Sequence, residues 1–129
     1  MIKKYLEYLR LIPKGIANPK KIIEGWVNDI KLNNSELPDD QVAEIVRRRA
    51  ICTSCPLNSF FAKKSQEYKD LYGENYQTER EEPHCAVCGC PIMKKTASLS
   101  SDCGLETYNN EHPDNVQKLK WTKYNETDN

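Results

Sequence analysis

Two short cysteine motifs decide how this chain folds, and they read Cys52-Thr-Ser-Cys55-Pro56 and Cys85-Ala-Val-Cys88-Gly89-Cys90-Pro91. In each motif two residues separate a pair of cysteines, a spacing that lets one tight turn present both sulfurs to a single ion. A glycine directly after the second cysteine accepts a left-handed backbone without steric cost, and Gly89 stands at that position. Because a structural zinc ion requires four ligands in tetrahedral array, the two pairs predict a Zn²⁺ site.

The expected ligands are the four cysteines of the two pairs, with two further cysteines as alternates. The four are Cys52, Cys55, Cys85 and Cys88, and the alternates that can replace members of the second pair are Cys90 and Cys103. A two-zinc cluster with bridging thiolates is a further arrangement. A tetrathiolate site carries a charge of about −2, which Lys94, Lys95 and the basic triplet 47–49 would partly offset. His84 and His112 are expected at the surface rather than as ligands.

Six cysteines can serve purposes other than metal binding, and the sequence disfavours each of them. An even number permits a disulfide framework, but the N-terminus shows no signal-peptide core, and clustered cysteines in a reducing compartment more often bind metal. Redox catalysis by a Cys-x2-Cys motif needs a βαβ context, which the sequence does not indicate. Catalytic zinc keeps an open coordination position, whereas six thiols favour a closed site. We therefore expect a structural zinc ion, no enzymatic activity, and a protein that is not secreted.

The pattern of apolar residues predicts a mainly α fold with a small zinc-ribbon or knuckle unit, which makes it a metal-stabilised α+β protein. Helices are expected over residues 2–12, from Pro19 onward, over 38–50 and over 59–72, with a short helical turn in 113–121. Residues 1–34 would form a basic amphipathic arm and residues 35–121 a zinc-binding domain. The helix 59–72 would be an insertion between the cysteine pairs, and residues 122–129 a disordered tail.

The arm has a charge and an apolar stripe that suggest a partner. Residues 1–34 carry seven basic and three acidic side chains, a net charge of +4, whereas the whole chain has a net charge of zero. The stripe expected to dock onto another protein consists of Ile22, Ile23, Trp26, Val27 and Ile30. Gly25 would cost about 1 kcal/mol of helix propensity, which indicates the close approach of another backbone. No run of eighteen apolar residues exists, so we expect no transmembrane segment.

The order of the motifs resembles that of a family of small cysteine-rich zinc-binding proteins of tailed bacteriophages. The resemblance covers about residues 47–121 and rests on Arg48 or Arg49, Ile51, Cys52, Cys55, Pro56, Cys85, Cys88, Gly89, Cys90, Pro91, Lys95, Thr96, Cys103, Lys120 and Trp121. It implies a phage-encoded zinc protein of the host cytoplasm. It supplies no activity.

These observations lead to one expected function and two alternatives. We expect a zinc-binding structural or interaction protein, as a component of the virion or of its assembly. The first alternative is a nucleic-acid-binding zinc ribbon in phage transcription or replication, served by the basic triplet 47–49, the arm and an aromatic helix face. Zero net charge tells against it, because phosphate contacts dominate such binding. The second is an interfacial membrane helix formed by the arm.

Overall fold

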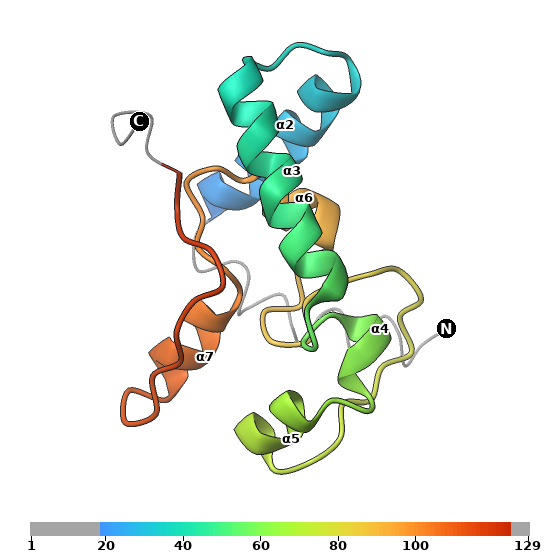
Figure 1. Cartoon of the computed structure of the whole chain (residues 1–129), viewed down its shortest axis with the longest axis vertical. Helices are drawn as coiled ribbons and strands as arrows, with labels where there is room; N and C mark the ends of the chain where they lie inside the picture. Colours follow the sequence, from blue (N-terminus) through green and yellow to red (C-terminus); the bar gives the residue numbers. More distant parts are fainter. Residues whose placement is uncertain (1–18, 125–129) are drawn as a thin grey trace.

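A computed structural model describes residues 19–124, and these residues form a mainly helical protein (Figure 1). The helices are α2 (Pro19–Asn33), α3 (Asp39–Ser54), α4 (Ser59–Ala62), α5 (Gln66–Tyr72), α6 (Ile92–Ala97) and α7 (Leu105–Glu111). Within residues 19–124, β-structure is limited to two isolated antiparallel bridges, Asn58 with Cys85 and His84 with Pro91. The mainly α prediction is confirmed, and the helix predicted over 2–12 lies outside the described residues.

The helices are arranged around α3, which runs through the middle of the molecule (Figure 1). Helices α2 and α6 pack against each other, and α6 also packs against α3. Helices α4, α5 and α7 lie beyond the C-terminal end of α3. None of the helices within residues 19–124 has the length and apolar character needed to cross a membrane.

Helix α3 extends four residues further than the sequence predicts. It begins after Pro38, with Asp39 and Asp40 in its first turn, where the helix dipole favours acidic groups. It continues through Ser54, so that Cys52 and the two residues after it are helical. The helix ends because Pro56 disfavours a helical backbone in the residue before it, and Cys55 is extended with φ −68° and ψ 130°.

Two hydrophobic clusters form the core. The larger contains Leu57, Ala62, Tyr68, Tyr76, Ala86, Val87, Cys103, Leu105, Tyr108 and Trp121. The smaller consists of Ile45, Ala97 and Leu99, with Leu32, Leu37 and Tyr124 packed against it. Because Leu32 belongs to α2, the described part of the predicted arm packs onto the rest of the protein.

The segment predicted as one helix over 59–72 forms two short helices. The Asn58 side chain accepts the backbone N–H of Phe60 and caps α4, and the Ser65 side chain accepts that of Tyr68 and caps α5. These caps satisfy the first N–H groups of two separate helices, which is why the chain breaks between them. Gly73 ends α5 in a left-handed conformation, as predicted.

Residues 113–124 also differ from the prediction. The Asn109 side chain donates to the backbone oxygen of Gln117 and accepts its N–H, which holds residues 112–120 as a loop instead of the predicted helical turn. The residues predicted to begin a disordered tail contact the body of the protein instead. Tyr124 donates its backbone N–H to Leu99 and its hydroxyl to Asp40. Residues 125–129 lie outside the described part.

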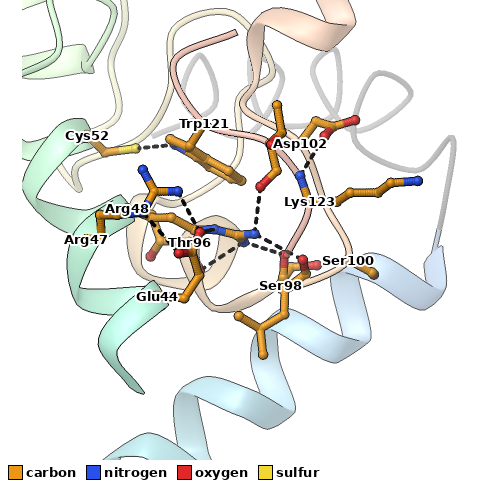
Figure 2. Close-up of polar contacts among 12 residues, drawn as sticks. Glu44, Arg47, Arg48, Cys52, Thr96, Ser98, Ser100, Asp102, Trp121 and Lys123 are labelled. Carbon is orange, nitrogen blue, oxygen red and sulfur yellow. Dashed lines mark hydrogen bonds and ion pairs between the residues drawn. The ribbon is translucent and has the colours of Figure 1, made fainter. Parts of the chain in front are cut away.

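Arg48 is a fully buried cation that ties α3 to two other segments (Figure 2). Its guanidinium donates to the carbonyl oxygens of Ser98 (2.9 Å), Leu99 (3.0 Å) and Thr122 (3.1 Å). It also pairs with Glu44 and lies 4.3 Å from the centre of the Trp121 ring. A planar guanidinium with five donors suits this position, because it satisfies several buried carbonyls at once.

The arginine triplet therefore does not face solvent as a unit. Arg49 bonds to Asp29 and to the backbone oxygen of Met93. Only Arg47 is exposed, and it pairs with Glu44 on the same helix. The use of the triplet for phosphate contacts, which the nucleic-acid alternative requires, is therefore wrong for Arg48 and Arg49.

We predict that Arg48→Ala lowers the free energy of unfolding by about 3–5 kcal/mol, because it leaves buried carbonyls and Glu44 without their partner. Arg48→Lys should recover part of this loss, since one ammonium group cannot replace the forked donors. Urea unfolding measures both effects. Arg47→Ala is the matched control and should change stability by no more than about 0.5 kcal/mol. Equal effects of the two alanine variants would contradict this role of Arg48.

Gly25 confirms the close backbone approach predicted from its place in α2. A Cβ atom at this position would overlap the carbonyl oxygen of Lys94 in α6 and would lie 3.3 Å from the Cβ of Ser98. The two helices can therefore pack at this distance only if residue 25 has no side chain.

The substitution Gly25→Ala has two opposite effects on stability, one through helix propensity and one through packing. Alanine gains about 1 kcal/mol of helix propensity, while the overlap costs about 1–3 kcal/mol and meets backbone that cannot rotate away. We expect the melting temperature to fall by about 5 °C. Lys20→Ala, at an exposed position of the same helix, should leave it unchanged, and a higher melting temperature for Gly25→Ala would show that α2 and α6 do not pack this closely.

Candidate metal centre

All six cysteines are free thiols, and four of them line one small cavity. The four are Cys52, Cys55, Cys85 and Cys103. Apolar walls are provided by Ile51, Leu57, Ile92, Leu105 and Trp121, and the lining also includes Asn58, Gly104 and two lysines, Lys95 and Lys120. The cavity therefore joins the end of α3, the loop before α6 and the segment leading into α7.

The first motif presents its sulfurs from the last turn of α3 and the extended residue that follows. The indole N–H of Trp121 donates to the sulfur of Cys52 at 3.3 Å (Figure 2). The backbone N–H of Leu57 donates to the sulfur of Cys55 at 3.4 Å. Donors of this kind stabilise negative charge on sulfur, and they are typical of thiolates that bind metal.

The second motif forms the tight turn that its spacing predicts. Gly89 has a φ of 78°, which confirms the left-handed position, and its N–H donates to the carbonyl oxygen of Cys85 at 2.7 Å. The backbone N–H groups of Cys88 and Cys90 point to the sulfurs of Cys85 and Cys88 respectively. The turn thus supplies its own donors to both sulfurs of the pair.

Cys103 enters the centre from a distant part of the sequence. Its backbone N–H donates to the carbonyl oxygen of Trp121, and the backbone N–H groups of Leu105 and Lys120 point to its sulfur. The next residue, Gly104, lies directly against the second motif. A Cβ atom there would be 2.6 Å from the sulfur of Cys85 and 2.9 Å from that of Cys88. Only a glycine at position 104 leaves room for this segment to lie against the sulfurs of the second cysteine motif.

Cys88 and Cys90 lie differently from the cysteines that line the cavity. Cys88 is buried, and its sulfur hydrogen-bonds with the sulfurs of Cys85 and Cys90. Cys90 is half-buried and is not part of the cavity lining. Of the two alternates named from the sequence, the structure therefore brings Cys103 to the centre and leaves Cys90 at its margin.

The electrostatics of the centre favour negative charge on some sulfurs and oppose it on others. Burial raises the pKa of the Cys52 thiol to about 11, although the Trp121 N–H acts in the opposite direction. The hydrogen bond between Cys85 and Cys88 raises the pKa of Cys85 and lowers that of Cys88. Neighbouring thiols thus compete for one negative charge when only protons are bound.

Two lysines supply positive charge to the sulfurs. Burial acts to lower the pKa of Lys95, but the nearby sulfurs of Cys88, Cys90 and Cys85 outweigh it, so that this pKa is raised. Burial likewise opposes the charge of Lys120, whose pKa is raised by Cys55 and Glu67. Lys94, also expected near the sulfurs, instead pairs with Asp29. The cations of the centre are therefore Lys95 and Lys120.

Neither histidine is fully exposed at the surface, where the sequence predicts both. His84 is fully buried, with Nδ1 2.9 Å from the carbonyl oxygen of Glu82 and Nε2 2.7 Å from the Tyr76 hydroxyl. Both ring nitrogens are thus engaged away from the sulfurs. His112 is half-buried and stacks on Tyr108 with ring centres 4.0 Å apart. The prediction of a surface position is wrong for His84, and no local sequence pattern indicates its burial.

No three His, Cys, Asp or Glu side chains in residues 19–124 are arranged in a geometry that could hold a metal ion. The sulfur of Cys88 is instead hydrogen-bonded to those of Cys85 and Cys90. The donor set nevertheless suits a thiophilic ion, because soft sulfur ligands, N–H donors directed at sulfur and two ammonium groups occur around one cavity.

Fold and site together define a small, mainly helical protein whose core is built around a cluster of free cysteines. The chain matches no protein-family model, no curated protein and no solved structure.

We predict that Gly104→Ala disturbs this cluster specifically. The added methyl group must displace the sulfurs of Cys85 and Cys88, and such overpacking costs about 1–3 kcal/mol. Urea unfolding should show the loss, and the reaction of buried thiols with a maleimide should become faster in the folded protein. Val116→Ala is the control, because this side chain is 66% exposed and lies outside the cysteine cluster. If both variants react with maleimide at the rate of the parent protein, Gly104 does not set the positions of the sulfurs.

Proposed function

We propose that this chain is a zinc-organised structural and interaction protein. The observation that carries the proposal is the convergence of Cys52, Cys55, Cys85 and Cys103 on one cavity, although Cys52 and Cys103 are far apart in the sequence. Thiols without disulfide bonds that meet in this way, with N–H donors and ammonium groups directed at them, are typical of structural zinc sites.

The proposed ligands differ in one position from the set that the sequence favours. We assign Cys52, Cys55, Cys85 and Cys103 to the ion, because these are the cysteines that line the cavity. Binding would require their sulfurs to move closer together, since no three such side chains in residues 19–124 are arranged to hold a metal ion. Cys88 hydrogen-bonds with Cys85 and Cys90, and neither Cys88 nor Cys90 lines the cavity. The ion, when bound, supplies a cross-link between the end of α3, the turn before α6 and the start of α7.

A zinc cross-link would matter for stability because the helices are short. Helices α4 to α7 have between four and seven residues each, and isolated helices of this length are not stable in water. Structural zinc contributes about 10–16 kcal/mol in small modules, which is comparable to the whole stability of a domain at about 5–15 kcal/mol. Removal of the metal should therefore unfold the half of the protein that surrounds the cysteines.

The decisive measurement is native mass spectrometry of the reduced protein together with metal analysis. We expect one zinc ion per chain, and loss of zinc when serine replaces any of Cys52, Cys55, Cys85 or Cys103. Cys88→Ser and Cys90→Ser are the matched controls and should retain the metal. Loss of zinc from Cys88→Ser with retention by Cys103→Ser would restore the sequence-based ligand set. Reduced protein that is free of metal and keeps its circular dichroism spectrum in a strong chelator would rule out a structural zinc site.

An interaction role is favoured over nucleic-acid binding. Arg48 and Arg49, which motivated the nucleic-acid alternative, are engaged inside the protein. The chain has a net charge of zero, which provides little long-range attraction for phosphate. The exposed side of α2, in contrast, carries large apolar side chains. The resemblance to cysteine-rich phage proteins extends the proposal to a component of a phage virion or of its assembly in the host cytoplasm.

A further inference from the structure

Helix α2 lies on the protein with its polar side inward and its apolar side outward. Its large apolar side chains Ile23, Trp26, Val27 and Ile30 are 62%, 48%, 42% and 57% exposed. They follow one another at spacings of three, one and three residues, which places them on a single face. Of the stripe predicted from the sequence, only Ile22 is half-buried. We call Ile23, Trp26, Val27 and Ile30 the α2 face.

The inward side of α2 is held by polar contacts with α6 and the loop that follows it. Asp29 pairs with Lys94 and with Arg49. The Glu24 carboxylate accepts the hydroxyl groups of Ser98 and Ser100 at 3.0 and 2.7 Å. These contacts exist only in this rotational setting of the helix, so α2 cannot turn its apolar side inward without breaking them.

Two further contacts fix the same setting. The Asn28 side chain donates to the carbonyl oxygen of Ala97 at 2.8 Å. Gly25 packs against the backbone of Lys94, where any side chain would overlap. The outward direction of the α2 face is thus determined by the packing of the opposite side.

The exposed charged side chains of α2 itself have one sign. Lys20 and Lys31 are exposed near the two ends of the helix. The acidic residues of α2, Glu24 and Asp29, are both engaged on the inward side. Trp26 lies 4.6 Å from the ammonium group of Lys94, which orients its ring at the centre of the face.

We propose that the α2 face is the docking site for an amphipathic helix of a partner protein, with acidic residues flanking the apolar stripe of that helix. The apolar side chains of the partner would pack between Ile23, Trp26 and Ile30, and its acidic residues would face Lys20 and Lys31. An oriented tryptophan at the centre of an exposed apolar face is typical of the residues that dominate binding energy at interfaces. The proposal deepens the interaction role proposed above and rests on it.

Charge argues against two occupants from the chain itself. A second copy of α2 would bring lysines to a face that has no free acidic side chain on its own helix. Residues 1–18 carry four basic side chains and one acidic one, so they too would add positive charge. Like charges at close range disfavour both pairings.

The position of Lys94 argues against a membrane surface as the occupant. Its ammonium group lies against the Trp26 ring and pairs with Asp29, so an ion pair sits at nearly the depth of the ring. Sinking the ring into hydrocarbon would carry these charges with it, which is costly. Zero net charge also gives the whole chain little attraction to anionic lipid.

The test uses the full chain in its zinc-bound, reduced form and two synthetic helical peptides. Both peptides carry leucines at the same helical spacing as the α2 face, and the flanking residues are glutamate in one and lysine in the other. Titration followed by Trp26 fluorescence, with Trp26→Phe as the signal control, should show about fivefold tighter binding of the glutamate peptide at low salt. The difference should shrink at 0.5 M salt, because exposed charges are screened.

Variants test whether binding occurs at this face. Ile23→Ser combined with Ile30→Ser should weaken the glutamate peptide by about tenfold or more without lowering the melting temperature, since both side chains are exposed in the free protein. Val116→Ser, at a 66% exposed apolar position outside α2, is the matched control and should bind as the parent does.

Four outcomes would overturn the proposal. The first is equal affinity for the two peptides, and the second is peptide binding that the α2 double variant does not weaken. The third is sedimentation of the free chain as a dimer at micromolar concentration. The fourth is that the chain floats with anionic phosphatidylglycerol vesicles and does not bind the peptides. Because metal content is measured on the same samples, a chain that holds zinc but binds no peptide refutes only the docking site. A chain that holds no zinc refutes the metal proposal separately.

Discussion

The buried guanidinium of Arg48 is the interaction on which the rest of the structure depends. It bonds to carbonyl groups on both sides of the segment that contains Cys103, and it lies over the ring of Trp121. Trp121 in turn donates to the sulfur of Cys52. One cation therefore aligns α3 with residues 96–99 and with the end of the described chain, and this alignment brings Cys103 to the sulfurs of the first motif. A neutral side chain could not replace it, because the carbonyl groups would stay buried without donors.

Helix α2, like Arg48, is held in place mainly by polar contacts. Its attachment to α6 relies on a paired carboxylate, side-chain amide and hydroxyl contacts, and a glycine, whereas its large apolar residues remain outside. Buried polar groups of this kind hold a helix in one orientation, because each hydrogen bond is lost when the helix rotates. The protein thereby keeps an apolar face available at its surface and maintains a defined fold beneath it.

The cysteine cluster belongs to the larger hydrophobic core, in the other half of the protein. The helices around it are short and are joined by loops. Lys95 and Lys120 place positive charge beside the sulfurs, and N–H groups are directed at Cys52, Cys55 and Cys103. Positive charge and N–H donors lower the free energy of keeping several thiolates close together. A metal ion that is bound by thiolates requires such surroundings.

The sequence by itself determined the features that depend on neighbouring residues. Pro19 at the start of α2, Gly73 at the end of α5 and the left-handed Gly89 were predictable, because proline and glycine restrict or free the backbone where they stand. The tertiary structure alone decided that Arg48 is buried, that Cys103 rather than Cys90 lines the cavity, and that the apolar side of α2 faces outward. Each of these depends on contacts between residues about 50 to 75 positions apart, such as Arg48 with Thr122. Local pattern carries no information on which distant segments will satisfy a charge or a sulfur, and only the folded chain brings those segments together.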